Sequence, residues 1–273
     1  MPELPEVESV RTDLERILVG KETISAVKLL SPRLRTSLNA KSISNVVGKP
    51  IYGIRRRAKY ILIDFEDGVL LSHLGMTGSW RTKLGNEDEM KHDHVIFSLS
   101  SGRQLVYRDP RRFGILEWVK SSDLKKNRWL KNLGPEPLGN EFSVGYFFSE
   151  IKKKKAPIKT TLMNQKLVVG LGNIYVNESL FLAGISPRKI SRRISFSHCE
   201  KLYLEIIKIL KLAIKRGGTT ISDYRRADGN SGSFQNELFV YNRVGLPCKR
   251  CETPIKSTKQ AGRSTFWCSL CQK

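Results

Sequence analysis

The seven residues LGPEPLG, at positions 133–139, divide the chain of 273 residues into two parts of different character. Glycine and proline interrupt regular secondary structure, so a short segment with two of each is typical of a linker. At about 150 residues per domain, this chain length predicts two domains or one domain with an appendage. We therefore expect a domain boundary at this stretch.

The residues before the linker begin with a helical pattern and continue with β-type runs. Apolar side chains recur at helical spacing over residues 7–18, with Pro5 in the first turn. Short runs rich in β-branched and aromatic residues follow, and Asp67-Gly68 stands between two of them as a hairpin turn. These runs cover residues 23–30, 60–65, 69–74, 95–99, 104–107 and 115–119. The pattern predicts an antiparallel β-sandwich flanked by helices.

The residues after the linker are dominated by helical patterns. An amphipathic helix is predicted over residues 197–215, and Cys199 on this helix is expected to be a buried, small apolar side chain. Residues 217–235 contain four glycines. A segment of this length without a clear period is typical of a functional loop or of disorder. Overall, the pattern predicts a mixed α+β protein.

Four cysteines near the end of the sequence have a spacing typical of structural zinc sites. They occur as CKRC (248–251) and CSLC (268–271), with sixteen residues between the two pairs. Four thiolates close a tetrahedron around one Zn²⁺ ion, which then supports structure and does not activate water. Two disulfides or a coincidental spacing are the alternatives, and a reducing cytoplasm disfavours disulfides. The predicted ligands are Cys248, Cys251, Cys268 and Cys271.

The charge of the chain favours a polyanionic partner. Lys and Arg number 48 and Asp and Glu number 26, which gives a formal net charge of +22. This charge attracts nucleic acid and disfavours self-association, so we expect a monomer. A solubilising charge without a partner is the plain alternative. No run of about 18 apolar residues is present, and the acidic opening is unlike a secretory signal, so we expect a cytoplasmic protein without a membrane partner.

The opening MPELPEVE (1–8) places reactive groups at the amino terminus. Removal of Met1 would expose Pro2 as a secondary amine, whose ordinary pKa of about 7.7–8.0 leaves it partly neutral at physiological pH. A neutral amine attacks a sugar aldehyde carbon and forms an iminium ion. Glu3 and Glu6 are carboxylates that could move protons nearby. An ordinary terminus is the alternative, because acidic residues are also favoured at the start of a helix.

Motifs along the chain resemble those of the formamidopyrimidine-DNA glycosylases, bacterial enzymes that remove oxidised purines such as 8-oxoguanine and then nick the strand. These motifs extend over nearly the whole chain in the expected order. They are MPELPEVE (1–8), RRRAKY (55–60), SHLGMTG (72–78), YRDPRRFG (107–114), KLVVGLGNIYVNESLF (166–181), GGTT (217–220), FQNELFVYNRVGLPCKRC (234–251) and GRSTFWCSLCQK (262–273).

The resemblance implies three domains. Residues 1–133 would form a catalytic β-sandwich with an N-terminal helix. Residues 134–237 would form a helix-two-turns-helix domain, in which the loop at 217–235 folds over the extruded base. Residues 238–273 would form a zinc finger built on a β-ribbon.

The resemblance also implies catalytic roles for Pro2, Glu3 and Lys59, and we add Arg263 to this catalytic set as a phosphate clamp because it lies between Gly262 and Ser264 near the predicted ribbon tip. In this family, Pro2 would attack C1′ of the damaged nucleotide and displace the base, after which the linked strand undergoes β- and then δ-elimination. Glu3 would protonate the sugar ring oxygen, and Glu6 would support the opening of the sugar. Lys59 would contact the phosphate beside the lesion. Without the resemblance, residues 55–59 are typical of a solvated basic strand edge, and Arg263 could be a solvated side chain near the ribbon tip.

Further residues implied by the resemblance would hold the opened duplex. Met76, Arg111 and Phe113 would fill the gap left by the extruded base, since a thioether adapts, a guanidinium can face the orphaned cytosine, and an aromatic ring unstacks a step. Met and Phe on strand-like segments are otherwise typical of a core. Asn173 would bind a backbone phosphate at a helix N-terminus, or serve only as a cap. Lys155, in a four-lysine run, would contact phosphate or the damaged base.

The expected function is that of a bifunctional DNA glycosylase and abasic-site lyase, which excises 8-oxoguanine and formamidopyrimidines from damaged double-stranded DNA and holds one structural zinc ion. The endonuclease VIII branch, which prefers oxidised pyrimidines, is the nearest alternative. Leu4, where that branch typically has glycine, favours the purine branch. A non-catalytic, zinc-containing nucleic-acid-binding protein is the alternative from a different class.

Overall fold

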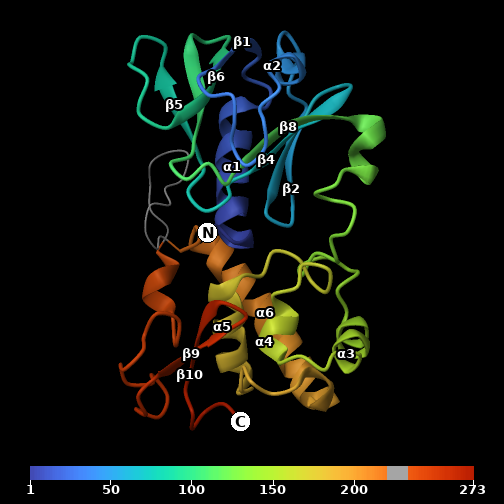
Figure 1. Ribbon diagram of the computed structural model, residues 1–273, viewed down its shortest axis with the longest axis vertical. Helices are drawn as coiled ribbons and strands as arrows, with labels where there is room; N and C mark the ends of the chain where they lie inside the picture. Colours follow the sequence, from blue (N-terminus) through green and yellow to red (C-terminus); the bar gives the residue numbers. More distant parts are fainter. Residues whose placement is uncertain (220–232) are drawn as a thin grey trace. The chain divides into compact units, whose positions relative to one another are not determined.

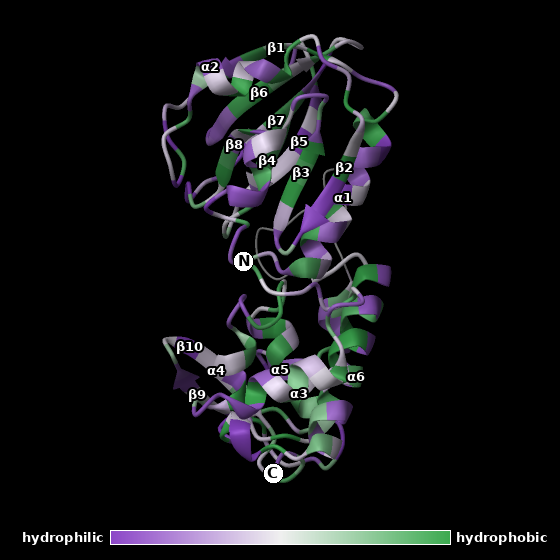
Figure 2. Ribbon diagram, turned by 90° about the vertical axis from the view of Figure 1, so that its right-hand side faces the viewer, coloured by the Kyte–Doolittle hydropathy of each residue, from purple (hydrophilic) through white to green (hydrophobic). Residues whose placement is uncertain are grey.

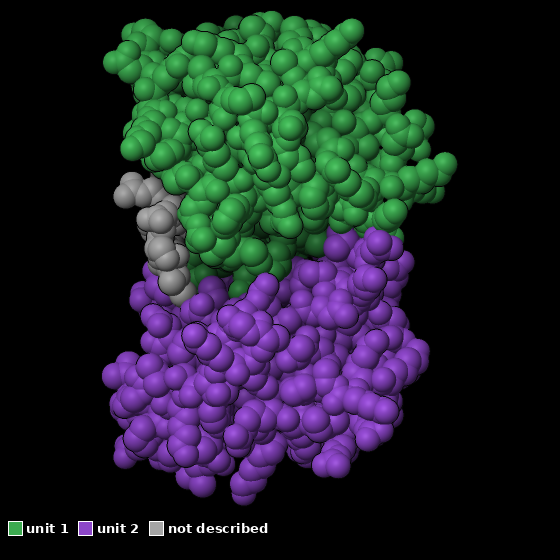
Figure 3. Space-filling model, viewed as in Figure 1, with its two compact units in different colours: residues 1–131, 216–233 green, residues 132–215, 234–273 purple. Residues whose placement is uncertain are grey.

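The computed structural model describes residues 1–219 and 233–273. It contains two compact units, which Figure 3 shows in different colours. Unit 1 comprises Met1–Lys131 and Arg216–Ser233, and unit 2 comprises Asn132–Lys215 and Phe234–Lys273. Most of the loop predicted at 217–235 lies outside the described residues, which include only its two ends.

Unit 1 contains an N-terminal helix, α1 (Leu4–Leu18), and two antiparallel four-stranded sheets (Figure 1). One sheet has the order β1 (Ile24–Leu29), β6 (Asp93–Leu99), β7 (Arg103–Arg108), β5 (Ser79–Leu84). The other has the order β2 (Gly53–Arg57), β3 (Tyr60–Asp64), β4 (Gly68–His73), β8 (Ile115–Lys120). The short elements of the unit are α2 (Ala40–Ile43), η1 (Ser44–Val46) and η2 (Ser121–Lys126).

One apolar core joins α1 to both sheets. Val10 and Leu14 on α1 belong to the same buried cluster as Leu70 on β4 and Phe97 on β6. Side chains on successive strand positions point to opposite faces, so the second sheet also presents apolar groups outward. Leu62 and Leu71 lie in this outer cluster, which the segment after β8 covers with its own apolar side chains. The predicted sandwich is therefore present, with a helix built into its core.

Each predicted β-run coincides with a strand, but β2 and β5 were not predicted. Residues 53–57 read GIRRR and residues 79–84 read SWRTKL, so neither stretch alternates cleanly between apolar and polar side chains. Both become strands because a neighbouring strand supplies hydrogen-bonding partners, β3 for β2 and β7 for β5. In β2 and β5, pairing with a neighbouring strand therefore outweighs the intrinsic strand propensity of the residues.

Unit 2 is helical, with a small two-stranded ribbon. Its helices are α3 (Val144–Lys152), α4 (Ile158–Leu162), α5 (Asn173–Ala183) and α6 (Phe196–Lys215), with the short turns η3 (Ser191–Arg193) and η4 (Phe234–Glu237). Strands β9 (Lys256–Gln260) and β10 (Arg263–Trp267) form the ribbon. Figure 2 shows that much of α5 and α6 is hydrophobic. The predicted amphipathic helix is α6, and Cys199 on it is fully buried as expected.

In the described parts of the chain, no helix is both long enough and apolar enough to cross a membrane.

Candidate active site and metal centre

Unit 1 gathers titratable side chains around the amino terminus. Pro2 is buried, and Glu3 and Glu6 at the start of α1 are only 3% and 2% exposed. Lys59 is 6% exposed and comes from the two-residue turn between β2 and β3. Ala58, the other residue of this turn, has a φ of 54°, which a non-glycine residue rarely adopts. A strained hairpin turn therefore carries the lysine.

The amino group in this cluster is easier to deprotonate than an ordinary one. Burial lowers the pKa of the Met1 amino group below its ordinary value of 8.0. The charges of Glu3 and Glu6 raise this pKa in part, while those of Lys59 and Arg111 lower it further. All four side chains are therefore close enough to act on the amino terminus through their charges. Such an environment increases the neutral, nucleophilic fraction of the amine at neutral pH.

Glu6 holds two separate parts of unit 1 together. Its Oε2 atom accepts a hydrogen bond from the backbone N–H of Glu3 at 2.8 Å. Its Oε1 atom accepts hydrogen bonds from the backbone N–H and the hydroxyl of Thr219 at 2.8 and 3.0 Å. Gly218 makes this approach possible, because an added Cβ would lie 2.8 Å from Glu6 Oε1 and the residue has a φ of +79°. These contacts connect the start of α1 to Thr219, and the supporting role of Glu6 in the opening of the sugar stays a prediction.

His73 lies beside Lys59 and is neutral at physiological pH. Burial, followed by the charges of Lys59 and Arg35, lowers the pKa of His73 to about 4. Its Nδ1 atom accepts a hydrogen bond from the backbone N–H of Gly75 at 2.9 Å, which leaves the ring proton on Nε2. The ring of Tyr60 packs against it with centroids 4.7 Å apart. The imidazole therefore orients the backbone at Gly75 without adding a charge near Lys59.

Met76 and Phe113 project from two loops of unit 1 and are 39% and 45% exposed. Arg111 is also exposed, and its guanidinium carbon lies 4.9 Å from the centroid of the Phe113 ring. The two loops touch, because a Cβ on Gly75 would lie 2.5 Å from the backbone carbon of Phe113. The structure thus brings the three predicted gap-filling residues together on the surface, and not in the core where apolar side chains would ordinarily lie.

Asp109 fixes the relation between these two loops. It is fully buried, and its Oδ1 atom accepts hydrogen bonds from the hydroxyl of Thr77 at 2.6 Å and from the backbone N–H of Arg111 at 3.3 Å. Its Oδ2 atom accepts one from the backbone N–H of Gly114 at 2.7 Å. The sequence analysis did not single out Asp109, although the pattern Asp-Pro is a common start of a turn.

In unit 2, Asn173 and the zinc ribbon form a second group. Asn173 is the first residue of α5, and its Nδ2 donates a hydrogen bond to the carbonyl oxygen of Ser264 at 2.9 Å. The Lys159 ammonium donates to the same carbonyl at 2.8 Å and to the hydroxyl of Thr265 at 2.7 Å. Arg263, the exposed first residue of β10, follows the turn of the ribbon. A helix N-terminus, an amide and an arginine thus lie close together, as an anion site requires.

Lys159 is a functional candidate that the sequence analysis missed. It is 1% exposed, and burial followed by the charge of Arg263 lowers its pKa to about 8. Lys155, the predicted residue, is exposed in the connection between α3 and α4. Lys155 stands out in the sequence because it belongs to a run of four lysines, whereas Lys159 is a single lysine between Ile158 and Thr160 and has no such signal. Lys159 is one of the buried residues of the short helix α4, and this burial becomes visible only in the structure.

Glu178 on α5 is an anchor for the chain that leads into the metal-binding region. Its carboxylate accepts backbone N–H hydrogen bonds from Phe239, Val240 and Tyr241 at 2.8, 2.9 and 2.7 Å. Burial raises the pKa of this carboxyl, while the three backbone donors act in the opposite direction. Three donors on one buried carboxylate fix a chain segment that has no regular secondary structure of its own.

The four cysteines form a cluster that fits one zinc ion. The Sγ atoms of Cys248, Cys251, Cys268 and Cys271 all lie within 4.8 Å of one another. The Sγ atoms of Cys251 and Cys268 are 3.4 Å apart, and those of Cys248 and Cys271 are 3.9 Å apart. A tetrahedron with Zn–S bonds of about 2.3 Å has sulfur atoms about 3.8 Å apart, so the thiols are already close to the required positions. The predicted zinc ligands are confirmed as one site, and the ion would hold the ribbon and the two Cys-x2-Cys turns together.

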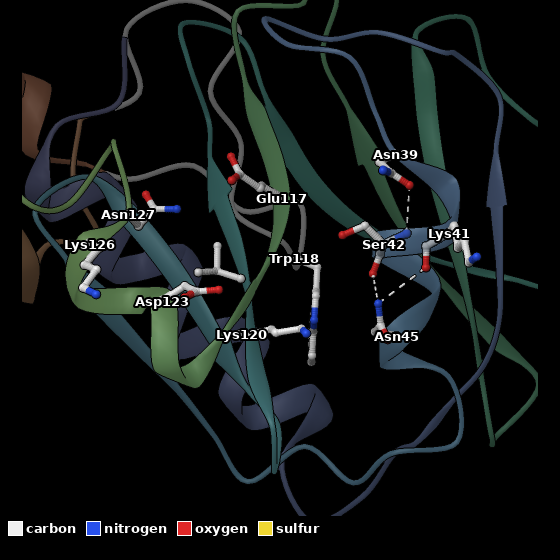
Figure 4. A pocket seen from close by; sticks show the side chains of 11 residues that line it. Asn39, Lys41, Ser42, Asn45, Glu117, Trp118, Lys120, Asp123, Lys126 and Asn127 are labelled. Atoms are coloured by element: carbon white, nitrogen blue, oxygen red, sulfur yellow. Dashed lines mark hydrogen bonds between the residues drawn. The ribbon is translucent and has the colours of Figure 1, made fainter.

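A separate pocket of about 550 Å³ in unit 1 has no predicted site residue in its lining. Figure 4 shows Trp118 between residues of α2 on one side and Lys120, Asp123 and Lys126 on the other. The polar groups of α2 are engaged with their own helix, since Asn39 Oδ1 accepts the backbone N–H of Ser42 at 2.9 Å. The lysines lie at an open surface beside acidic groups, so the pocket offers no built anion site.

Comparisons with known proteins cover all of these regions. Residues 1–116 match the family model of the formamidopyrimidine-DNA glycosylase N-terminal domain, residues 133–225 match that of the formamidopyrimidine-DNA glycosylase H2TH domain, and residues 245–273 match that of a zinc finger found in FPG and IleRS. The formamidopyrimidine-DNA glycosylase of Bdellovibrio bacteriovorus is 47% identical over 273 residues, with all of both chains covered.

Solved structures of similar proteins have the same fold. The Fpg of Lactococcus lactis in complex with DNA containing an abasic site is 39% identical, with a TM-score of 0.91 and 99% of both chains covered. The wild-type Lactococcus lactis protein with DNA containing an N7-benzyl-Fapy-dG is 39% identical, with a TM-score of 0.92 and all of both chains covered. Matched by family models from the amino-terminal domain to the zinc finger, the chain belongs to the formamidopyrimidine-DNA glycosylase family.

Proposed function

We propose that this chain is a bifunctional DNA glycosylase and abasic-site lyase that excises oxidised purines from double-stranded DNA and acts as a monomer. Family membership supports the glycosylase activity. The observation that carries the rest of the proposal is the amino-terminal cluster of unit 1. There, the pKa of the Met1 amino group is lowered within reach of the charges of Glu3, Glu6 and Lys59, and the Pro2 nitrogen that removal of Met1 would expose is buried in the same cluster.

The proposed nucleophile is the nitrogen of Pro2 after removal of Met1. This nitrogen forms a bond to C1′ of the damaged nucleotide, while the bond between C1′ and the base breaks and the base leaves with the electron pair of that bond. The nitrogen, which is positively charged after the attack, then loses its proton, and the departing base takes up one proton. Glu3 gives a proton to the sugar ring oxygen as the ring opens, and C1′ becomes part of an iminium ion. Burial of both Pro2 and Glu3 favours these steps because water is excluded from them.

The iminium ion makes the strand breaks possible. It acidifies the C2′ proton, whose loss expels the 3′ phosphate oxygen in a β-elimination. A second, δ-elimination expels the 5′ phosphate oxygen. Lys59 is the proposed partner of a phosphate beside the lesion, since it is the cation that acts on the amino terminus from the turn between β2 and β3. Lys59 and Glu3 together would keep the attacking amine and the sugar in one orientation.

The extruded base must leave a gap that the protein fills. Met76, Arg111 and Phe113 are the proposed gap-filling residues, because all three are exposed on two touching loops. The planar guanidinium of Arg111 lies over the Phe113 ring, which limits the orientations that its donors can take. Such a planar donor set can face the acceptor groups of a cytosine that has lost its partner. This arrangement favours a purine lesion opposite cytosine.

Unit 2 is the proposed phosphate-binding part. Asn173 at the start of α5 and Arg263 at the start of β10 are the proposed phosphate ligands, and Lys159 holds the ribbon beside Asn173. Lys155 is a further proposed contact from the exposed lysine run. The zinc ion, held by the four cysteines, would keep the ribbon folded.

Borohydride trapping tests the proposed chemistry. The zinc-loaded full-length chain is incubated with a duplex that carries 8-oxoguanine opposite cytosine, and borohydride is added to reduce any iminium ion. We expect a stable crosslink on the amino-terminal peptide, located at Pro2 by mass spectrometry. A duplex without the lesion is the control. A crosslink at a lysine, or salt-sensitive binding without a crosslink, contradicts the proposal.

A second duplex tests the choice of lesion. The same chain is incubated with DNA containing thymine glycol, at the same concentrations. We expect faster base release from the duplex with 8-oxoguanine. Faster release of the pyrimidine would assign the chain to oxidised pyrimidines instead.

A further inference from the structure

Unit 2 contains a cavity of about 380 Å³, and all of its lining residues belong to unit 2. Its walls come from α5, α6 and the chain after residue 233. Apolar side chains dominate the lining, with Leu182 from α5, Ile209 and Leu212 from α6, and the rings of Phe234 and Phe239. A cavity of this size and character is in the range that binds small organic ligands.

One polar atom in the lining has no partner. The Oε2 atom of Glu205 is buried, and no hydrogen-bond donor reaches it within the described parts of the chain. Glu178 lines the same cavity, but three backbone N–H groups satisfy its carboxylate. Buried acceptors in folded proteins are almost always hydrogen-bonded, so an unpartnered carboxylate oxygen in a cavity indicates a missing donor.

The carboxylate of Glu205 lies on the same face of α6 as two apolar residues that line the cavity. Glu205, Ile209 and Leu212 are separated by four and three residues, which places them along one side of a helix. Lys208, Glu237 and Lys249 also line the cavity, and Lys249 Nζ lies 5.5 Å from the centroid of the Phe239 ring in the same lining. Among the described lining residues, the buried side-chain atom without a hydrogen-bond partner is Glu205 Oε2.

We propose that this cavity binds a small organic cation with an apolar body, whose ammonium or amidinium group donates to Glu205 Oε2. The apolar part of the ligand fills the space between Leu182, Leu212 and Phe239, where it replaces water in contact with hydrocarbon. The charged group restores the hydrogen bond that the carboxylate lacks, and a charge-assisted bond of this kind is stronger than a neutral one. A neutral or anionic ligand of the same shape lacks this interaction.

This site does not depend on the proposed glycosylase reaction. None of the residues proposed to contact DNA or the sugar lines it. The cavity does share Lys249 with the first Cys-x2-Cys turn, so it lies beside the zinc-binding region. Its ligand can be detected without DNA and without any measurement of activity.

Three probes of matched size test the proposal. They are 2-phenylethylammonium, 2-phenylethanol and 3-phenylpropanoate, each titrated into the zinc-loaded full-length chain. Binding is followed by the NMR signals of isotope-labelled leucine and isoleucine methyl groups. We expect the ammonium probe to bind about tenfold more tightly than the alcohol, with the largest shifts at Leu182, Ile209 and Leu212. The carboxylate probe is expected to bind weakest.

Two glutamate variants on the same helix form the matched control. Glu205→Gln is expected to weaken the ammonium probe about tenfold, to the affinity of the alcohol, while Glu200→Gln leaves it unchanged. Glu200 is exposed on α6 and does not line the cavity. Leu212→Trp is expected to fill the space and to abolish binding of all three probes, with the methyl spectrum of the rest of the chain retained.

Several results would overturn the proposal. These are equal affinities for the three probes, tightest binding of the carboxylate, absence of methyl shifts at saturating ammonium probe, or equal effects of the Glu205 and Glu200 variants. Each of these outcomes leaves the proposed glycosylase reaction untouched, because the borohydride experiment measures a different site.

Discussion

A single oxygen of Glu6 receives two hydrogen bonds from Thr219, a residue 213 positions further along the chain, at 2.8 Å from the backbone N–H and 3.0 Å from the hydroxyl. The other oxygen of Glu6 receives the backbone N–H of Glu3. With both oxygens committed as acceptors, Glu6 acts as a positioning residue and not as a proton donor. It connects the start of α1 to the last described residue before the segment 220–232.

Replacement of Glu6 by glutamine should therefore weaken unit 1. A glutamine has one oxygen and one NH2 group, so a backbone donor at Glu3 or Thr219 would face another donor. A buried donor without an acceptor costs about 1–3 kcal/mol, whereas Thr219→Val removes only the hydroxyl and should cost about 1 kcal/mol. Urea unfolding of the two single variants and the double variant measures the free energies and their coupling.

Glu66→Gln is the control for this experiment. Glu66 is exposed, so its replacement should change the free energy of unfolding by less than about 0.5 kcal/mol. The interpretation of Glu6 fails if Glu6→Gln is as mild as this control, or if the Glu6 and Thr219 effects are fully additive.

The pH dependence of trapping should reveal the lowered pKa of the amino group. Only the neutral amine attacks, so the trapping rate should rise with pH and then level off. Burial lowers the pKa of the Met1 amino group, and Pro2 is buried in the same cluster, so we expect the Pro2 nitrogen to titrate below its ordinary range. The charge of Lys59 also lowers the pKa of the Met1 amino group, so Lys59→Met should move the inflection for Pro2 to higher pH as well as slow the reaction. The rate of borohydride trapping between pH 5.5 and 9 gives both profiles. An unchanged inflection in the variant would show that Lys59 does not act on the amine.

His73 should make the chain sensitive to acid. Its pKa is about 4 in the fold and near 6.5 when unfolded, so the folded state binds the proton less readily. The stabilisation is complete above pH 6.5 and is lost as the pH falls towards 4, by up to about 3 kcal/mol. His73→Gln keeps an acceptor for the Gly75 N–H but does not titrate. The loss of stability between pH 7 and pH 4.5 should therefore be smaller in the variant, as measured by urea unfolding, and an equal loss would contradict the assignment.

The sequence predicted those structures that depend on the type and spacing of residues close together in the chain. The periodic apolar positions of α1 and α6 and the two Cys-x2-Cys pairs predict their structures locally, because a helix face and a metal site depend on regular spacing. The turn at Asp67-Gly68 also marks its hairpin, which joins β3 to β4. The motif residues at the amino terminus were identified by resemblance to a family.

Other features arise only from long-range contacts. Strand β2, with three arginines, is a strand because β3 pairs with it, and no property of its own residues shows this. Asp109 and Thr77 are 32 positions apart, and their hydrogen bond exists only once the two loops meet. Lys159 lies 105 positions before the carbonyl to which it donates. Buried polar networks of this kind are set by the tertiary structure, so single-sequence patterns do not reveal them.

Lys159 should hold the zinc ribbon in place independently of the metal. Its ammonium donates to the Ser264 carbonyl and to the Thr265 hydroxyl, and Thr265 lies three residues before the ligand Cys268. Lys159→Met keeps the length of the side chain and removes both bonds. We expect the amides of β9 and β10 to exchange with solvent about tenfold faster, which corresponds to about 1.4 kcal/mol. Zinc content should remain one ion per chain, and Lys153→Met, at an exposed position, should change neither quantity.

Loss of the metal should remove hydrogen-exchange protection from more residues than Lys159→Met does, but not from unit 1. Zinc binding by such sites contributes about 10–16 kcal/mol, so Cys268→Ser or a chelator should abolish protection throughout residues 245–273. The core of unit 1 contains none of the four cysteines, so amides of β6 and β7 should keep their protection. Hydrogen exchange read by mass spectrometry separates the two cases: Lys159→Met loosens only the ribbon, while metal loss unfolds both Cys-x2-Cys turns. Release of zinc by Lys159→Met would contradict this separation. The Lys159 ammonium would then stabilise the metal site itself, and not only the ribbon that carries Arg263.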